Sequence, residues 1–152
     1  MIEYLDLQKD NKEYIDKTFS SIKKKFKTKK YFILDSFVKN FENNFKEYIG
    51  SNYAVGVNSG TDALIIALRA IGIKSGDEVI LSSLTASATA ISVLNVNATP
   101  VFADIEEDFL TIDPKEVEKK ITNKTKAIIV VHLYGQSCDI SAINKIAKKH
   151  NL

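Results

Sequence analysis

The segment at residues 53–68, YAVGVNSGTDALIIAL, constrains the fold more than any other part of the sequence. Residues 53–57 are a short β-branched and aromatic run, which is typical of a strand. Residues 58–62 form a polar turn, and the apolar residues that follow have helical spacing. The segment therefore predicts a strand, a tight turn and a helix.

This turn allows two interpretations. The first backbone N–H groups of a helix are unpaired and lie at its positive end, so they attract an anion such as a phosphate. Gly60 would let a ligand approach the backbone closely, and Ser59 and Thr61 add hydroxyl donors. Alternatively, Ser59 is only a helix cap and Asp62 only a partner of the helix dipole. The turn by itself favours this second interpretation.

Length and composition narrow the class of protein. The 152 residues fit one ordinary domain, and the net charge of +2 gives no electrostatic reason to expect nucleic acid or a membrane surface as a partner. No apolar run approaches the ~20 residues of a membrane-spanning helix, and the first ten residues lack the pattern of a signal peptide. The single cysteine, Cys138, excludes an internal disulfide and fits a reducing compartment. We therefore expect a cytoplasmic protein.

Two amphipathic helices are predicted ahead of the first strand, at residues 9–26 and 36–49. Lysines gather at residues 23–30, where the sequence favours a solvated face over a site for a diphosphate or nucleic acid. The apolar positions that define the two helices are Ile15, Phe19, Ile22 and Phe26 in the first, and Phe37, Val38, Phe41, Phe45, Tyr48 and Ile49 in the second.

Further along the chain, apolar strands alternate with helices. Strands are predicted at residues 78–81, 99–103 and 126–131, and helices at residues 61–71, 86–94 and 141–150, with another helix headed by the cap and capping-box pattern at 113–116. Such an alternation predicts an α/β fold with a mainly parallel sheet covered by helices on both faces. We accordingly divide the chain into an N-terminal helical segment, residues 1–50, and a sheet-containing domain, residues 51–152.

Four strings occur in an order and spacing that resemble the opening of the DegT/DnrJ/EryC1/StrS family of nucleotide-sugar aminotransferases. They are FILDSFVKNFE, YAVGVNSGTDALIIALRAIGIKSGDEVI, TPVFADIEEDFLTIDP and TKAIIVVHLYGQSCDI. The resemblance implies part of an aspartate-aminotransferase-like (fold-type I) large domain that binds pyridoxal phosphate (PLP), usually in a dimer. It also implies as substrates a nucleotide-linked keto sugar and an amino donor, typically glutamate. The turn of Ser59, Gly60 and Thr61 would then hold the cofactor phosphate, which reverses the preference drawn from the turn alone.

The resemblance also implies what these residues lack. Family members carry the aspartate that faces the pyridine nitrogen and the Schiff-base lysine at positions that correspond to points beyond Leu152. The sequence then corresponds to about the first two fifths of a typical member, and by itself it is expected to be inactive. No catalytic residue is predicted within it. Many members place an aromatic residue against the cofactor ring where this sequence has Ala86, so Ala86 is a cofactor-binding position without a stacking side chain.

Other functions stay open at this point. A truncated remnant or interaction protein would keep the strand, turn and helix without turnover, and a dehydratase of the same superfamily would use a histidine in place of the lysine. A dinucleotide-binding domain is disfavoured because there is no GxGxxG motif. His132, at a strand end on the side where such sheets bind ligands, is either a hydrogen-bonded structural residue or a catalytic one, and the sequence favours the structural role. His150 is predicted to be a surface residue at a helix end. No metal site is predicted, because His, Cys and carboxylates do not occur at ligand spacing.

Overall fold

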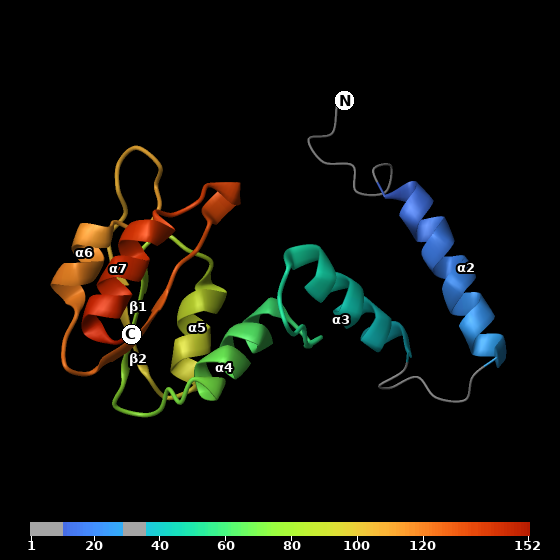
Figure 1. Ribbon diagram of the computed structural model, residues 1–152, viewed down its shortest axis with the longest axis horizontal. Coiled ribbons are helices and arrows are strands. Elements are labelled where there is room, and N and C mark those ends of the chain that lie inside the picture. The colour runs from blue at the N-terminus through green and yellow to red at the C-terminus, as the bar shows by residue number, and fades with distance from the viewer. Residues whose placement is uncertain (1–10, 29–35) are drawn as a thin grey trace. The chain divides into compact units, whose positions relative to one another are not determined.

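A computed structural model describes residues 11–28 and 36–152 of the chain (Figure 1). Two compact units divide at residue 56, and we call them the N-terminal unit, Met1–Gly56, and the sheet unit, Val57–Leu152. The N-terminal unit contains helices α2, Lys12–Thr28, and α3, Ser36–Ile49. Both amphipathic helices are therefore confirmed, although the predicted start at residue 9 lies outside the described residues.

Helix α3 ends in a glycine cap. Gly50 adopts a positive φ of 68°, and its N–H donates to the carbonyl of Glu47 at 3.3 Å. The N–H of Ser51 donates to the carbonyl of Lys46 at 2.9 Å, which completes a Schellman motif. Gly50 ends the helix because a residue without a β-carbon adopts this left-handed conformation with little strain.

The sheet unit is built on three parallel strands, with β1 between β2 and β3. The last pair in the β1–β3 ladder joins Leu81 to Ile129, so β3 ends two residues earlier than the sequence predicts. The strands are β1, Glu78–Ser82; β2, Thr99–Ala103; and β3, Thr125–Ile129. The helices are α4, Gly60–Ala70; α5, Ser87–Asn95; α6, Pro114–Lys120; and α7, Ile140–His150, with the 3₁₀ turn η1, Leu133–Gly135, between β3 and α7.

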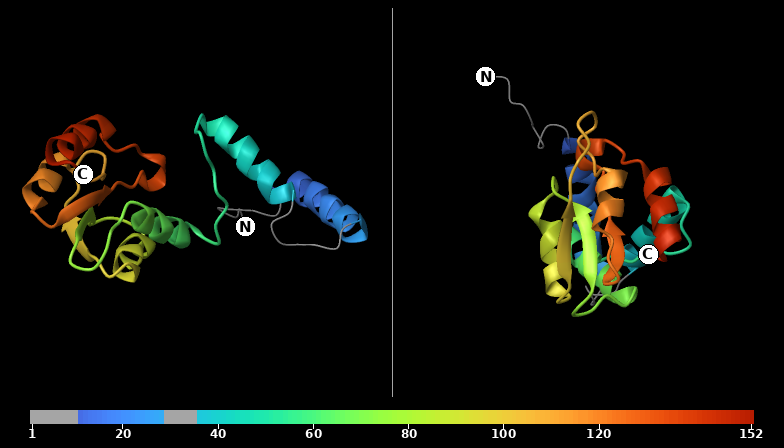
Figure 2. Two further views of the ribbon diagram at one scale, coloured as in Figure 1. Left: turned by 60° about the horizontal axis from the view of Figure 1, so that its bottom comes forward. Right: turned by 90° about the vertical axis from the view of Figure 1, so that its left-hand side faces the viewer.

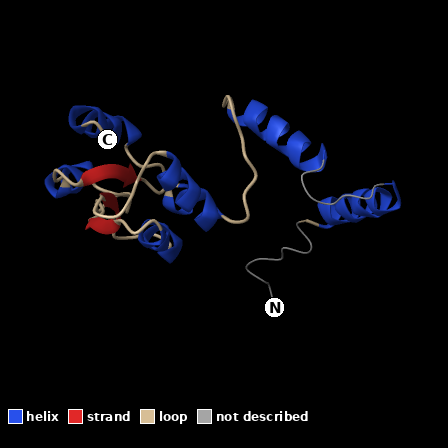
Figure 3. Ribbon diagram, turned by 90° about the horizontal axis from the view of Figure 1, so that it is seen from below, coloured by secondary structure: helices blue, strands red, loops and turns tan. Residues whose placement is uncertain are grey.

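Side chains of β1 alternate between two hydrophobic clusters. Val79 and Leu81 belong to the cluster that contains residues of α4 and α5, whereas Ile80 belongs to the cluster that contains residues of α6 and α7. Figures 2 and 3 show the strands between these helices. The predicted α/β fold, with a parallel sheet covered on both faces, is therefore confirmed, and a strand buried on both sides explains the continuously apolar sequence of β1.

The predicted strand at residues 53–57 is wrong for this structure. The segment has no regular secondary structure, and the side chains of Tyr53 and Val55 are 85% and 77% exposed. Both edges of β1 are paired with other strands, and no strand in the described part of the chain pairs with residues 53–57. The N–H of Gly56 donates instead to Oε1 of Glu42 in α3, at 2.8 Å. β-Branched composition does not produce a strand where no ladder partner is available.

At the start of helix α6 the predicted N-cap is confirmed, whereas the predicted capping box is wrong. Asp113 is the N-cap, and its Oδ1 accepts the N–H of Lys115 at 2.8 Å. The predicted capping box does not form, because the N–H of Asp113 donates to the carbonyl of Asp104 at 3.0 Å. The carboxylate of Glu116 pairs with Lys119 instead.

Candidate functional site

The start of α4 carries the three predicted phosphate-binding residues. Ser59 is the N-cap, in an extended conformation, and its Oγ accepts the N–H of Asp62 at 3.1 Å. The same hydroxyl donates to Oδ2 of Asp62 at 2.9 Å, and this carboxylate oxygen also accepts from Nδ2 of Asn58 at 3.0 Å. A hydroxyl has a single proton to donate, so Ser59 is already occupied as a donor. Sequence reasoning assigned Asp62 to the helix dipole only and missed this contact.

Gly60 and Thr61 provide the free donors at this helix start. Among the described residues, no hydrogen bond forms from the N–H of Gly60, the N–H of Thr61 or the hydroxyl of Thr61. The first N–H within the helix to find a backbone acceptor is that of Ala63, which donates to the carbonyl of Ser59 at 3.0 Å. Three unused donors at the positive end of a helix of this length fit a phosphate group.

Space around Gly60 is consistent with a ligand there. A β-carbon at Gly60 would have no atom of the described residues within 4 Å, and Gly60 does not have a positive φ. Neither internal packing nor backbone conformation therefore requires glycine at this position. A glycine that the fold does not need fits a site where a bound group approaches the backbone.

Ala86 lies at the start of the neighbouring helix. It follows β1 and is the N-cap of α5, with φ −64°, ψ 142° and no side-chain hydrogen bond. Helices α4 and α5 contact each other, and Figure 1 shows them side by side. Within the described residues, no hydrogen bond links Ala86 to Ser59, Gly60 or Thr61. The two helices that carry the predicted site residues are therefore adjacent. Ser59, Gly60 and Thr61 lie together in the α4 turn, whereas Ala86 has, in the described part of the chain, no hydrogen bond to any of them.

His132 follows β3 at the edge of the sheet where its parallel strands end, the edge at which such sheets bind ligands. Its Nδ1 accepts the N–H of Cys138 at 3.1 Å, so the predicted hydrogen bond of His132 is confirmed. An accepting Nδ1 requires that the neutral imidazole carry its proton on Nε2. Cys138 is buried, and its Sγ donates to the carbonyl of Val131 at 3.0 Å.

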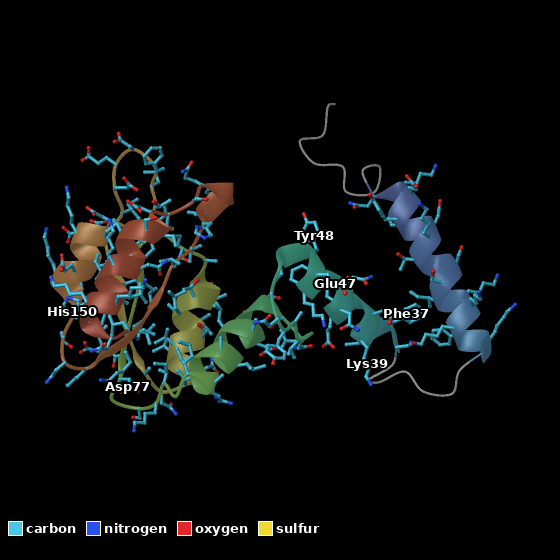
Figure 4. The ribbon with its side chains drawn as sticks, in the orientation of Figure 1. Phe37, Lys39, Glu47, Tyr48, Asp77 and His150 are labelled. Carbon is cyan, nitrogen blue, oxygen red and sulfur yellow. The ribbon has the colours of Figure 1, made fainter. Side chains whose placement is uncertain are left out.

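His150 lies at the end of α7, as predicted, but its side chain is partly buried and its Nε2 is covered, so it is not the surface side chain that the sequence suggests (Figure 4). Its Nε2 is 3.8 Å from Oε1 of Glu118, and the same oxygen accepts from Nζ of Lys149 at 2.6 Å. The hydrogen bond from Lys149, and then its positive charge, lower the pKa of the Glu118 carboxyl. This cluster ties α7 to α6 and is part of the outer helical layer.

The described part of the chain contains neither a metal-binding cluster nor a membrane-spanning helix. No group of three or more His, Cys, Asp or Glu side chains is arranged to hold a metal ion within residues 11–28 and 36–152. In the same part of the chain, no helix has both the length and the apolar character that crossing a membrane requires.

The sheet unit is a three-layer α/β fold with a parallel sheet, a class of fold that binds ligands at the carboxyl ends of its strands. The model of the DegT/DnrJ/EryC1/StrS aminotransferase family matches residues 13–152. The chain therefore belongs to this family.

Curated relatives match over the whole chain. The chain is 44% identical over 152 residues to dTDP-3-amino-3,6-dideoxy-alpha-D-galactopyranose transaminase from Aneurinibacillus thermoaerophilus, covering 100% of this chain and 42% of that protein. It is 40% identical over 152 residues to UDP-2-acetamido-2-deoxy-3-oxo-D-glucuronate aminotransferase from Pseudomonas aeruginosa, again covering 42% of that protein. The chain thus spans about two fifths of the length of these relatives.

Solved structures agree with the fold. The DesV structure from S. venezuelae superposes with a TM-score of 0.93 at 41% identity, covering 99% of this chain and 40% of that one. NtdA from Bacillus subtilis, solved with bound cofactor PMP, superposes with a TM-score of 0.89 at 34% identity, covering 92% and 32% of the two chains. The architecture is therefore that of part of a fold-type I aminotransferase.

Proposed function

We propose that residues 1–152 form the N-terminal part of a PLP-dependent aminotransferase that acts on a keto group of a nucleotide-linked sugar, with glutamate as amino donor. Residues 1–50 would be its N-terminal helical segment and residues 51–152 the first part of its PLP-binding large domain. The reactions named for relatives that match the whole chain support the reaction class and the substrate class. The three unused donors at the start of α4 are the structural observation that carries the proposal.

Gly60 and Thr61 would hold the cofactor phosphate through their two backbone N–H groups and the Thr61 hydroxyl. Ser59 would position the turn, because its hydroxyl is bonded to Asp62. Ala86, at the start of α5, would line the cofactor ring with a methyl group and would not stack on it. When bound, PLP supplies the electron sink that amino transfer requires. We assign proton transfer to no residue of this segment.

The remaining parts of the proposal follow from family resemblance and composition. We infer a homodimer from the family resemblance. We infer a cytoplasmic location, without a nucleic-acid or membrane partner, because the net charge is close to zero and relatives are named as a sugar transaminase and a polysaccharide biosynthesis protein. Alone, residues 1–152 should not transfer amino groups, because family members carry the cofactor-binding lysine at a position that corresponds to a point beyond Leu152.

Amino transfer by the complete protein tests the proposal. PLP, glutamate and a keto sugar linked to dTDP, UDP or GDP would be incubated with it, and 2-oxoglutarate and the amino sugar measured. We expect both products in equal amounts with at least one of these substrates. Residues 1–152 alone serve as the control and should form neither. Complete protein that retains PLP but forms no amino sugar from any of them would contradict the proposed substrate class.

A further inference from the structure

Tyr134 is held in an exposed and strained position. It is the central residue of η1, its side chain is 99% exposed, and its backbone adopts φ 53° and ψ 25°. Left-handed backbone is unfavourable for a bulky residue, and an exposed aromatic ring gains nothing from internal packing. Strain of this kind persists where the surrounding structure imposes it, and it clusters at active sites, ligand clamps and switch regions.

The surrounding loop, residues 131–138, imposes this conformation. Its turn is closed by the N–H of Gly135, which donates to the carbonyl of His132 at 3.2 Å, and by the N–H of Gln136, which donates to the carbonyl of Leu133 at 3.0 Å. Its far end is held by Cys138, which bonds to Nδ1 of His132 and to the carbonyl of Val131. Cys138 is itself buried in the hydrophobic cluster on the α6 and α7 face. The loop is therefore anchored at both ends and presents the ring of Tyr134 to solvent.

The position of this loop suits contact with the end of a long ligand that lies farthest from the α4 turn. It follows β3, so it lies at the edge of the sheet where β1 ends and α5 begins (Figure 1). Cys138 anchors the loop in the α6 and α7 layer, whereas Gly60 and Thr61 belong to α4, whose buried residue Leu68 packs on the opposite face of the sheet. With the cofactor phosphate at the α4 turn, the cofactor and the substrate bound next to it must together extend across the edge of the sheet to reach Tyr134.

We propose that Tyr134 is the stacking contact for the nucleobase of the nucleotide-linked sugar. This inference rests on the proposed function, which supplies a substrate whose flat base is separated from the reacting sugar by a diphosphate. Every nucleobase has a π-face, so the ring of Tyr134 would support binding without selecting one base. The rigid loop would reduce the entropy that is lost when the ring is ordered against the base.

Binding of nucleoside diphosphates to the complete, PLP-loaded protein tests this inference. UDP, dTDP and GDP would be titrated by calorimetry into the wild type and three variants. Tyr134→Phe keeps the ring and should bind within about twofold of wild type, whereas Tyr134→Ala should bind at least about fivefold more weakly. Tyr134→Gly should lose the same affinity without a lower melting temperature, because glycine tolerates the left-handed backbone. Tyr48→Ala, at an exposed tyrosine on α3, is the matched control.

The outcomes separate this inference from the proposed function. Wild-type protein that binds none of the three diphosphates and transfers no amino group would overturn both. Amino transfer with equal diphosphate affinity in wild type and Tyr134→Ala would overturn the role of Tyr134 alone. A Tyr134→Ala variant that changes its oligomeric state or loses PLP, with diphosphate affinity unchanged, would place the ring against a partner subunit or the cofactor, and it would also overturn the nucleobase contact.

Discussion

The N-terminal unit and the sheet unit use the same kind of residue in opposite ways. In the N-terminal unit, the apolar side chains of α2 and α3 are exposed, and Phe41 is 61% accessible. In the sheet unit, Val79, Ile80 and Leu81 are fully buried between two helical layers. Apolar periodicity predicted the helices of both units, but it did not predict which apolar faces are covered within the described chain.

This difference has a physical cause. A helix forms from local hydrogen bonds and apolar spacing, whereas burial requires a second surface of matching shape. Strand β1 has such surfaces on both faces and a ladder partner on both edges. Stability should therefore be concentrated in the sheet unit and be low in the two N-terminal helices.

Truncation of a core side chain gives the largest effect that we expect from this difference. In the complete protein, Ile80→Ala should lower the free energy of unfolding by about 2–5 kcal/mol, because it leaves a cavity beside α6 and α7. Ile22→Ala, at a helical residue that is 44% exposed, is the matched control and should cost less than about 1 kcal/mol. Urea unfolding followed by circular dichroism measures both. Equal losses would show that α2 is covered in the complete protein and would break the comparison.

The two glycine caps give an intermediate effect. Gly72 ends α4 with φ 86°, as Gly50 ends α3 with φ 68°, and a β-carbon would have no described atom within 4 Å at either position. The local strain of Gly→Ala should thus be about 1 kcal/mol in both. Gly72→Ala should lower the global stability, whereas Gly50→Ala should only increase amide exchange in the last turn of α3. Hydrogen exchange resolves the two, and global destabilisation by Gly50→Ala would count against a loosely held α3.

The ion pair of Glu118 and Lys149 gives the smallest effect. Lys149 lowers the pKa of Glu118 in the folded protein. The pair therefore contributes to stability above the pKa that Glu118 has in the unfolded chain, and this contribution is lost as pH falls through the pKa of Glu118 in the folded protein. Glu118→Gln should remove this pH dependence with only a small change in stability, since the pair is exposed and screened by salt. Thermal melts between pH 3 and 7, at low and high salt, measure it. An unchanged pH profile in the variant would contradict this role.

Much of the sheet unit was predictable because its signals are local. β2 was predicted with its observed bounds from an apolar run, and Asp113 and Pro114 located the start of α6. The strand at residues 53–57 was not predictable in the same way, because a strand depends on a partner elsewhere in the chain. The hydrogen bonds of Asp62 to Ser59 and Asn58 depend on side-chain rotamers, which spacing does not determine. The left-handed backbone of Tyr134 is imposed by the anchored loop around it, and the residue type gives no sign of it.

The most direct test of the central claim is PLP retention at the start of α4. Dialysis followed by absorbance would compare complete wild-type protein with Thr61→Ala, Thr61→Ser and Gly60→Val. We expect Thr61→Ala to weaken PLP binding by roughly 1.5–3 kcal/mol, the value of a hydrogen bond to a charged group, and Thr61→Ser to retain most of the affinity. Gly60→Val should weaken it further, because its side chain would occupy the open space beside the free N–H groups. Equal PLP affinity in wild type, Thr61→Ala and Gly60→Val would contradict the assignment of the cofactor phosphate to this turn.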